Sequence, residues 1–88
     1  MKAIITVVGK DTVGILAKVS TACAEANANI VEVNQSVLKD MFAMTMMVEI
    51  GTDITIDLLR EKLEKVSEET ATKIHVMHED IFNSMHKL

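Results

Sequence analysis

The chain has 88 residues, of which 49% are hydrophobic and 25% are charged, and this composition predicts one globular domain rather than a disordered segment. The net charge is −4 and only nine residues are Lys or Arg, which argues against direct nucleic-acid binding because phosphate neutralisation needs a basic face. The single cysteine excludes an internal disulfide. The sequence has no signal-peptide pattern and no apolar stretch near the ~20 residues of a membrane span, so we expect a cytoplasmic protein with no membrane contact.

The first part of the chain predicts a strand, a polar loop and a helix. Residues 2–8 are apolar and rich in β-branched side chains, and this strand is expected to stop at Gly9. A helix is expected from Gly14 to Ala26, with an apolar stripe of Leu16, Val19, Cys23 and Ala26. The loop either turns the chain only or also binds a ligand, because free backbone N–H groups at a helix N-terminus suit a carboxylate.

The middle of the chain predicts two strands joined by a turn at Lys39 and Asp40. The first of these strands runs from Ile30 to Leu38. Its two faces are Val31, Val33 and Val37 against Glu32, Asn34 and Ser36. The second has one apolar face of Phe42, Met44, Met46, Val48 and Ile50. The period of two favours core packing for these methionines over a methionine-rich binding surface.

The last part predicts a helix, a strand and a short terminal helix. The helix is expected from about Thr55, as its N-cap, to Glu69, with a buried stripe of Ile56, Leu59, Leu63 and Val66. A strand from Thr72 to His78 and a helix from Glu79 to His86 follow. The order is therefore βαββαβ plus a helix. It predicts an α+β fold of the ferredoxin-like kind, with a four-stranded antiparallel sheet and two helices on one face.

Missing chemistry excludes several functions that this fold can carry. A heavy-metal carrier needs paired cysteines after the first strand, and this chain has only one cysteine. An acylphosphatase-like enzyme needs an arginine in the first loop, whereas Arg60, the only arginine, falls on the expected outer side of the second helix. An RNA-recognition module needs aromatic residues on its central strands, and the only aromatic residues are Phe42 and Phe82.

Two segments resemble the ACT domain, a small amino-acid-sensing module of metabolic regulation. The segment from Gly9 to Leu16 looks like the first loop of that family, and the segment from Ala28 to Gln35 resembles its second strand. Val13 stands where the family commonly has proline, which leaves the loop less rigid. The resemblance covers residues 2–78 and implies an ACT domain over 1–78 with a helical tail over 79–88. It is closest to stand-alone bacterial ACT proteins and is similar to half of the glycine cleavage system repressor.

This resemblance implies a non-catalytic regulatory protein that binds an amino acid or a related metabolite. The candidate ligand-binding residues are Asp11, Thr12, Val13, Gly14, Ile15, Asn34 and Gln35. Four of them have a structural alternative: Asp11 suits a helix cap, Gly14 suits close helix–strand packing, and the two amides suit a solvated strand edge.

Other reactive residues predict no catalytic or metal site. Cys23 lies on the apolar stripe of its helix, where a buried thiol is unreactive. Strand alternation places His75 and His78 on opposite faces, and no cysteine or spaced carboxylate completes a metal site with them. No nucleophile, base and orienting group can be assembled, so neither an enzyme nor a cofactor is expected.

The second strand of this topology lies at a sheet edge, which predicts a homodimer. Residues 30–38 contain no Pro, Gly or Lys that would protect an edge, and three valines favour pairing with a second copy. ACT domains similarly join side by side, with the ligand loops at the junction. The alternative is a protein–protein interaction module without a small ligand, in which Ile81, Phe82 and Met85 of the tail form the docking ridge; the same residues could instead pack on the sheet.

Overall fold

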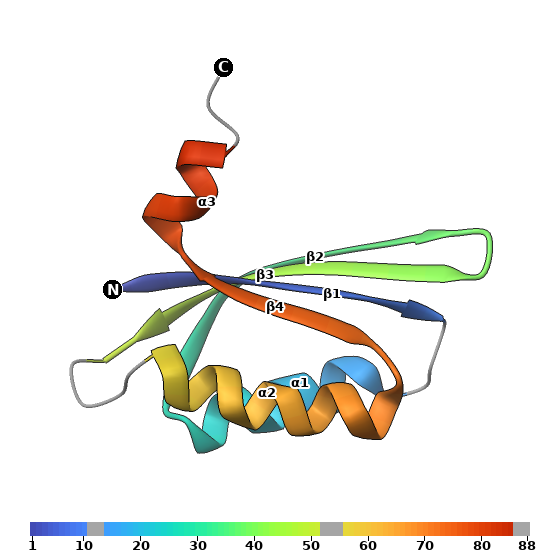
Figure 1. Ribbon diagram of the computed structural model, residues 1–88, viewed down its shortest axis with the longest axis horizontal. Helices are drawn as coiled ribbons and strands as arrows, with labels where there is room; N and C mark the ends of the chain where they lie inside the picture. Colours follow the sequence, from blue (N-terminus) through green and yellow to red (C-terminus); the bar gives the residue numbers. More distant parts are fainter. Residues whose placement is uncertain (11–13, 52–55, 86–88) are drawn as a thin grey trace.

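The computed structural model describes residues 1–10, 14–51 and 56–85. The elements follow one another in the order strand, helix, two strands, helix, strand, helix (Figure 1). Their bounds are β1 (Lys2–Lys10), α1 (Ile15–Glu25), β2 (Ala28–Leu38), β3 (Met41–Ile50), α2 (Ile56–Thr70), β4 (Lys73–His78) and α3 (Glu79–Met85). Asp11, Thr12 and Val13 of the predicted ligand loop, the predicted N-cap Thr55, and His86 lie outside the described residues.

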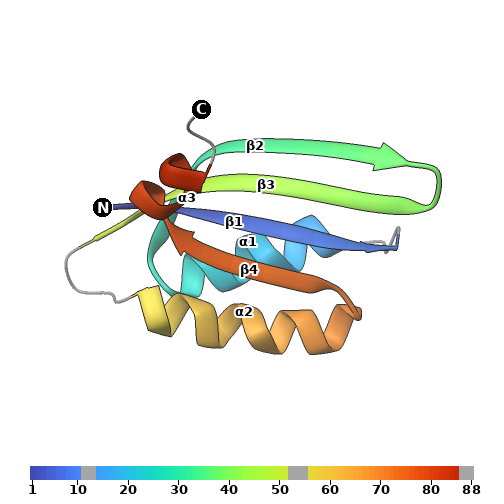
Figure 2. The same cartoon turned by 45° about the horizontal axis from the view of Figure 1, so that its top comes forward.

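The four strands form one antiparallel sheet in the order β2-β3-β1-β4, which places β2 and β4 at the edges. The helices α1 and α2 cover one face of this sheet, and α3 lies against the other (Figures 1 and 2). We call these the helix face and the open face. The predicted ferredoxin-like fold is therefore confirmed, with both main helices on one side.

The core lies between the helix face and the two helices. Alternate residues of β3, from Phe42 to Ile50, are all buried there, which confirms the predicted core face of this strand. Leu59, Leu63 and Val66 of α2 are buried against them as the helical spacing predicts. Met44 and Met46 of β3 therefore serve packing and not a binding surface.

The buried side of α1 begins one residue earlier than the sequence indicated. Ile15 is 2% exposed whereas Leu16 is 36% exposed. Residues four apart share one helix face, so Ile15 aligns with Val19 and Cys23, and Leu16 is rotated from them by about 100°. The prediction of Leu16 as a core residue was wrong, and its side chain is free on the outside of the helix.

The first strand does not stop at Gly9. It continues to Lys10, and Gly9 pairs with Phe42 of β3. A Cβ atom at Gly9 would lie 2.7 Å from Cγ2 of Thr72 and 3.3 Å from its Cα. The glycine is therefore needed because another segment packs on it, and not because it ends the strand.

A β-bulge in β2 changes which of its side chains face the helices. Ile30 pairs with Val48 and Glu32 with Met47, so Val31 is an extra residue without a partner of its own. Beyond the bulge Val33, Gln35 and Val37 lie opposite core residues of β3, on the helix face. Glu32, Asn34 and Ser36 lie on the open face. The predicted separation of the two faces is right except for Val31, which the bulge removes from the alternation.

The short helix α3 packs on the open face of its own chain. It contacts β1 and β4, and Ile4 of β1 on that face is only 3% exposed. The backbone N–H of Asp80 donates to Nδ1 of His78 at 3.0 Å, which satisfies one N–H of the first turn. Phe82 is partly buried, while Ile81 remains 56% exposed. Of the two uses considered for the tail, packing on the sheet is the one with contacts in the structure.

A chain that ends at His78 should therefore be less stable by about 1.5–3 kcal/mol, because Ile4 loses its cover. Urea unfolding of the two chains measures this difference. Ile81→Ser is the matched control, since it changes an exposed side chain of the same helix and should leave the unfolding midpoint unchanged. An equal midpoint for the shortened chain would contradict the packing role of α3.

Candidate functional site

The N-cap residue of α1 is a glycine in a left-handed conformation. Gly14 is this N-cap residue and has φ +89°, and as a glycine it has no side chain that could cap the helix. Its carbonyl accepts from the N–H of Lys18 at 3.0 Å, which starts the helix. Among the described residues, no atom outside the adjacent positions lies within 4 Å of a Cβ built on Gly14. Gly14 is therefore required by its backbone angle and not by packing, and the space beside it is open.

The first turn of α1 offers backbone groups rather than side chains. The N–H groups that begin a helix have no acceptor within it and carry the positive end of the helix dipole. The Ile15 side chain is buried in the core, so only its backbone can meet a ligand. The described part of the loop thus provides N–H donors suited to a carboxylate.

The two amide residues of β2 lie on opposite faces of the sheet. Asn34 pairs with Thr45 on the open face, and Gln35 pairs with Met44 on the helix face. Both side chains are exposed. Because α1 covers the helix face, Gln35 shares a side with Gly14 and Ile15, whereas Asn34 does not. Of the predicted residues that the structure describes, Gly14, Ile15 and Gln35 therefore lie on the helix side of the sheet and Asn34 lies on the other.

The outer edge of β2 carries exposed apolar side chains on its helix side. Val33 is 36% and Val37 60% exposed, and Leu16 of α1, the helix that contacts β2, is 36% exposed. The strand has 11 residues and a free edge, since β3 is its only neighbour in the sheet. A long edge of this kind is a template for pairing with another strand.

The opposite edge of the sheet is protected by Arg60. Its Nη2 donates to the carbonyl of Val76 in β4 at 2.8 Å, and its Nη1 is held by Oδ1 of Asp57 at 2.9 Å. The side chain is half-exposed, but the guanidinium reaches the sheet and is not simply on the outer side of the helix as the sequence suggested. This contact occupies one carbonyl of the six-residue edge strand β4 and so makes that edge less suited to strand pairing than the edge of β2.

The histidines and the cysteine lie as predicted. His75 pairs with Thr6 and His78 with Ala3, so the two imidazoles lie on opposite faces. In the described ranges no group of three or more metal-ligating side chains comes together. Burial raises the pKa of Cys23 to about 11, so its thiol stays protonated at neutral pH and is a poor nucleophile. No helix in the described part of the chain is long and apolar enough to cross a membrane.

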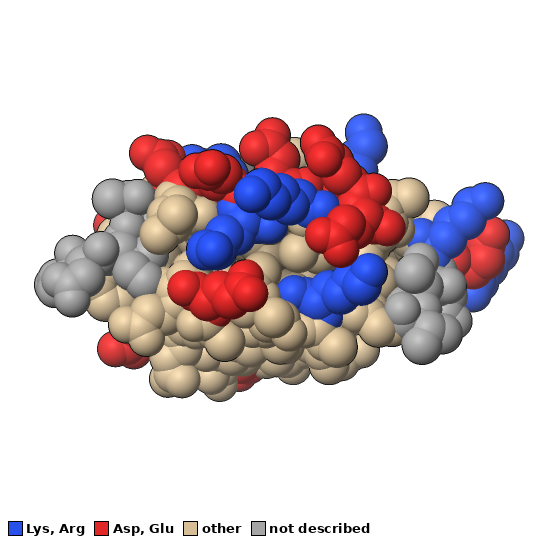
Figure 3. Space-filling view, turned by 90° about the horizontal axis from the view of Figure 1, so that it is seen from below, with Lys and Arg blue, Asp and Glu red and all other residues tan. Residues whose placement is uncertain are grey.

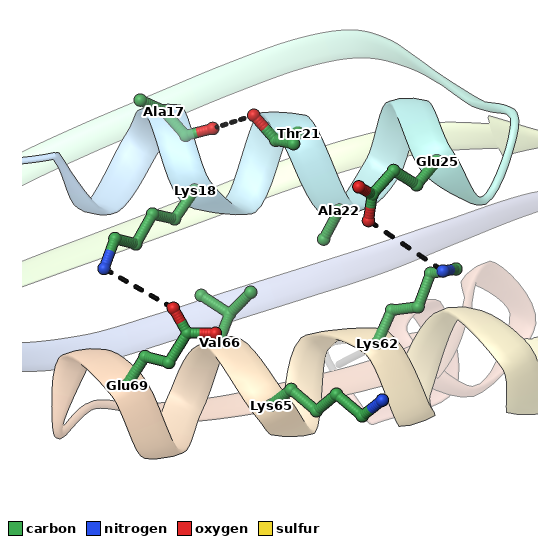
Figure 4. Close-up of a pocket in the computed structure, with 9 residues that line it drawn as sticks. All are labelled: Ala17, Lys18, Thr21, Ala22, Glu25, Lys62, Lys65, Val66 and Glu69. Carbon is green, nitrogen blue, oxygen red and sulfur yellow. Dashed lines mark hydrogen bonds and ion pairs between the residues drawn. The ribbon is translucent and has the colours of Figure 1, made fainter.

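A groove between α1 and α2 is a feature that the sequence reasoning missed. It has a volume of about 370 Å³ and is lined by residues of both helices, as Figure 4 shows. Its lysines and glutamates come from segments some 40 positions apart, roughly residues 17–25 and 62–69. No spacing within either helix indicates that these charges meet, and only the packing of the helices brings them together.

A four-stranded antiparallel βαββαβ sheet with both main helices on one face defines an α+β domain of the ferredoxin-like class. The comparisons agree with this class. A model of the ACT domain matches residues 2–77, and the chain belongs to the ACT domain family.

A curated relative and one solved structure match this chain over nearly the whole of both chains, and a further structure contains the fold within a longer chain. A UPF0237 protein of Listeria innocua is 48% identical over 90 residues that span the whole of both chains. The structure of an ACT domain protein from Streptococcus pneumoniae superposes with a TM-score of 0.82 at 40% identity and covers 98% of each chain. The structure reported for a glycine cleavage system transcriptional repressor has a TM-score of 0.76 at 20% identity, over 85% of this chain and 43% of that one, and it shares the fold. The chain is thus a single ACT domain, a regulatory module, and matches the stand-alone kind over its full length.

Proposed function

We propose that this protein is a homodimeric sensor that binds an amino acid or a related small metabolite between two copies and has no reaction of its own. The observation that carries the proposal is that β2, an edge strand of the sheet, is contacted by α1, the helix whose N-cap is Gly14. Neither feature completes a ligand site alone, because the described part of α1 offers backbone donors and β2 offers amides.

The dimer follows from pairing two β2 edges around a two-fold axis perpendicular to the sheet. Such pairing gives one continuous eight-stranded sheet and keeps both helix layers on the same side. Val33 and Val37 of both copies would then be covered, and this burial contributes roughly 25 cal/mol per Å² of apolar surface. Since Arg60 makes the β4 edge less suited to pairing, the β2 edge is favoured, and a closed dimer forms instead of a filament.

The ligand would lie on the helix side of this junction. Its carboxylate would accept hydrogen bonds from the N–H groups of the first α1 turn, with the open space at Gly14 allowing close approach. The amide of Gln35 from the second copy would orient the amino group through its carbonyl oxygen. Asn34 faces the other side of the sheet, so this proposal assigns it no contact with the ligand.

A thermal-shift screen of the twenty amino acids tests the proposal. A ligand present at 100 times its dissociation constant should raise the free energy of unfolding by about 2.7 kcal/mol. Gln35→Ala should reduce the shift, and Asn34→Ala, the adjacent amide on the opposite face, should not. No response to any amino acid at millimolar concentration would contradict the proposal.

The second candidate is a protein–protein interaction module without a small ligand. It is favoured by one observation, the 56% exposure of Ile81 on α3, although that helix is otherwise seated on the sheet. A negative amino-acid screen together with a partner protein that binds the wild type and not Ile81→Ser would select this candidate.

A further inference from the structure

The groove between α1 and α2 lies on the outer surface of the helix layer, away from the β2 edge. Its lining includes small or apolar side chains: the buried Ala22 of α1 and Val66 of α2 lie between the helices, and Ala17 and Thr21 of α1 are exposed. The Thr21 hydroxyl donates to the carbonyl of Ala17 at 2.9 Å and so is turned to its own helix. Short side chains on α1 keep the groove open, and its volume of about 370 Å³ is in the range of small-ligand pockets.

Two ion pairs between the helices close the ends of the groove. Nζ of Lys18 lies 3.5 Å from Oε2 of Glu69, and Nζ of Lys62 lies 3.9 Å from Oε1 of Glu25, as the dashed lines in Figure 4 show. The glutamates are more than half exposed and the distances are long for ion pairs, so each pair is weak and its lysine can turn to another anion.

Lys65 lies between these two ion pairs on α2, and it is the lysine of the groove lining that is in neither pair. None of the ion pairs in the described ranges includes it, and the i,i+4 partner available in sequence, Glu61, is not paired with it. The lining of the groove therefore carries three ammonium groups and two carboxylates, which leaves one positive charge on a protein of net charge −4. Figure 3 shows Lys or Arg side chains near the middle of this side of the molecule, with acidic side chains around them.

We propose that this groove binds a short-chain organic acid, through its carboxylate at Lys65 and Lys62 and its carbon chain on Ala22 and Val66. One carboxylate neutralises the excess charge. An amino acid would fit less well, because its ammonium group restores the excess positive charge that its carboxylate neutralises. This site is separate from the β2 junction and does not rest on the proposed function.

Titration of the full-length protein with isocaproate, followed by backbone amide NMR shifts, tests this site. Leucine differs from isocaproate by one ammonium group and is the matched ligand control, and inorganic phosphate is an anion without a carbon chain. We expect saturable shifts over residues 17–25 and 62–69 with isocaproate and weaker binding of both controls.

Two variants locate the site. Lys65→Gln should weaken isocaproate binding about tenfold, the size of one charge-assisted contact, while Lys39→Gln in the β2–β3 turn should leave it unchanged. Ala17→Leu fills the groove without changing its charge and should weaken binding as well. Equal affinity for leucine or phosphate, or an unchanged affinity in Lys65→Gln, would overturn the proposal.

Discussion

Replacing Gly9 by alanine should lower the free energy of unfolding by about 1–3 kcal/mol, the usual cost of overpacking a filled space. A loss of stability would be informative, because replacing glycine by alanine where the backbone is unstrained normally stabilises a protein. It does so by lowering the conformational entropy of the unfolded chain. Here the new Cβ would lie 2.7 Å from Cγ2 of Thr72, and Thr72 is 6% exposed. Denaturant unfolding measures the change.

Thr72 cannot move away easily, because three interactions hold it. Its hydroxyl lies 2.8 Å from that of Thr70, its N–H donates to the carbonyl of Ser67 at 3.1 Å, and its own carbonyl accepts from the Ser67 hydroxyl. Thr72→Ser removes the clashing methyl group and keeps the hydroxyl. Combined with Gly9→Ala it should restore much of the lost stability, so the two changes should be non-additive. Additive losses, or a neutral Gly9→Ala, would show that Gly9 is not needed for this contact.

Replacing Val33 by lysine should convert the proposed dimer to monomer. Pairing of two β2 edges would bury an unpaired ammonium group, which costs about 3 kcal/mol or more and raises the dissociation constant more than a hundredfold. The fold itself should tolerate the change, because Val33 is already 36% exposed in the single chain. Analytical ultracentrifugation over a concentration series measures the dissociation constant.

Thr45→Lys is the matched control for this substitution. Thr45 is exposed in β3, directly beside β2, but on the open face of an inner strand. Thr45→Lys adds the same charge to the same sheet without touching the free edge of β2. The dimer dissociation constant of this variant should therefore equal that of the wild type. Equal dimerisation of Val33→Lys and Thr45→Lys would exclude β2 as the pairing edge.

The fold could be predicted from the sequence because its signals are local and periodic. The alternate apolar residues of β3 and the buried stripe of α2 follow from two simple periods, and the structure confirms both. The errors come from contacts between distant segments. Thr72 determines why residue 9 is a glycine, and the Val31 bulge depends on pairing with β3, which no local pattern indicates.

The candidate site could be predicted only as a set of residues and not as an arrangement. Adjacent positions of a strand face opposite sides, but the helix side of β2 is fixed only after the bulge and the register with β3 are known. Gln35 therefore lies with the α1 N-terminus and Asn34 does not. The groove was missed for a related reason, since its charges meet only when α1 packs beside α2.

Sedimentation of the wild-type protein at micromolar concentration tests most directly whether two copies make one ligand site. The mass is measured with and without the amino acid found in the screen. We expect a species near twice 9.7 kDa, held more tightly when the ligand is present. A species of 9.7 kDa that binds the same amino acid without associating would contradict it.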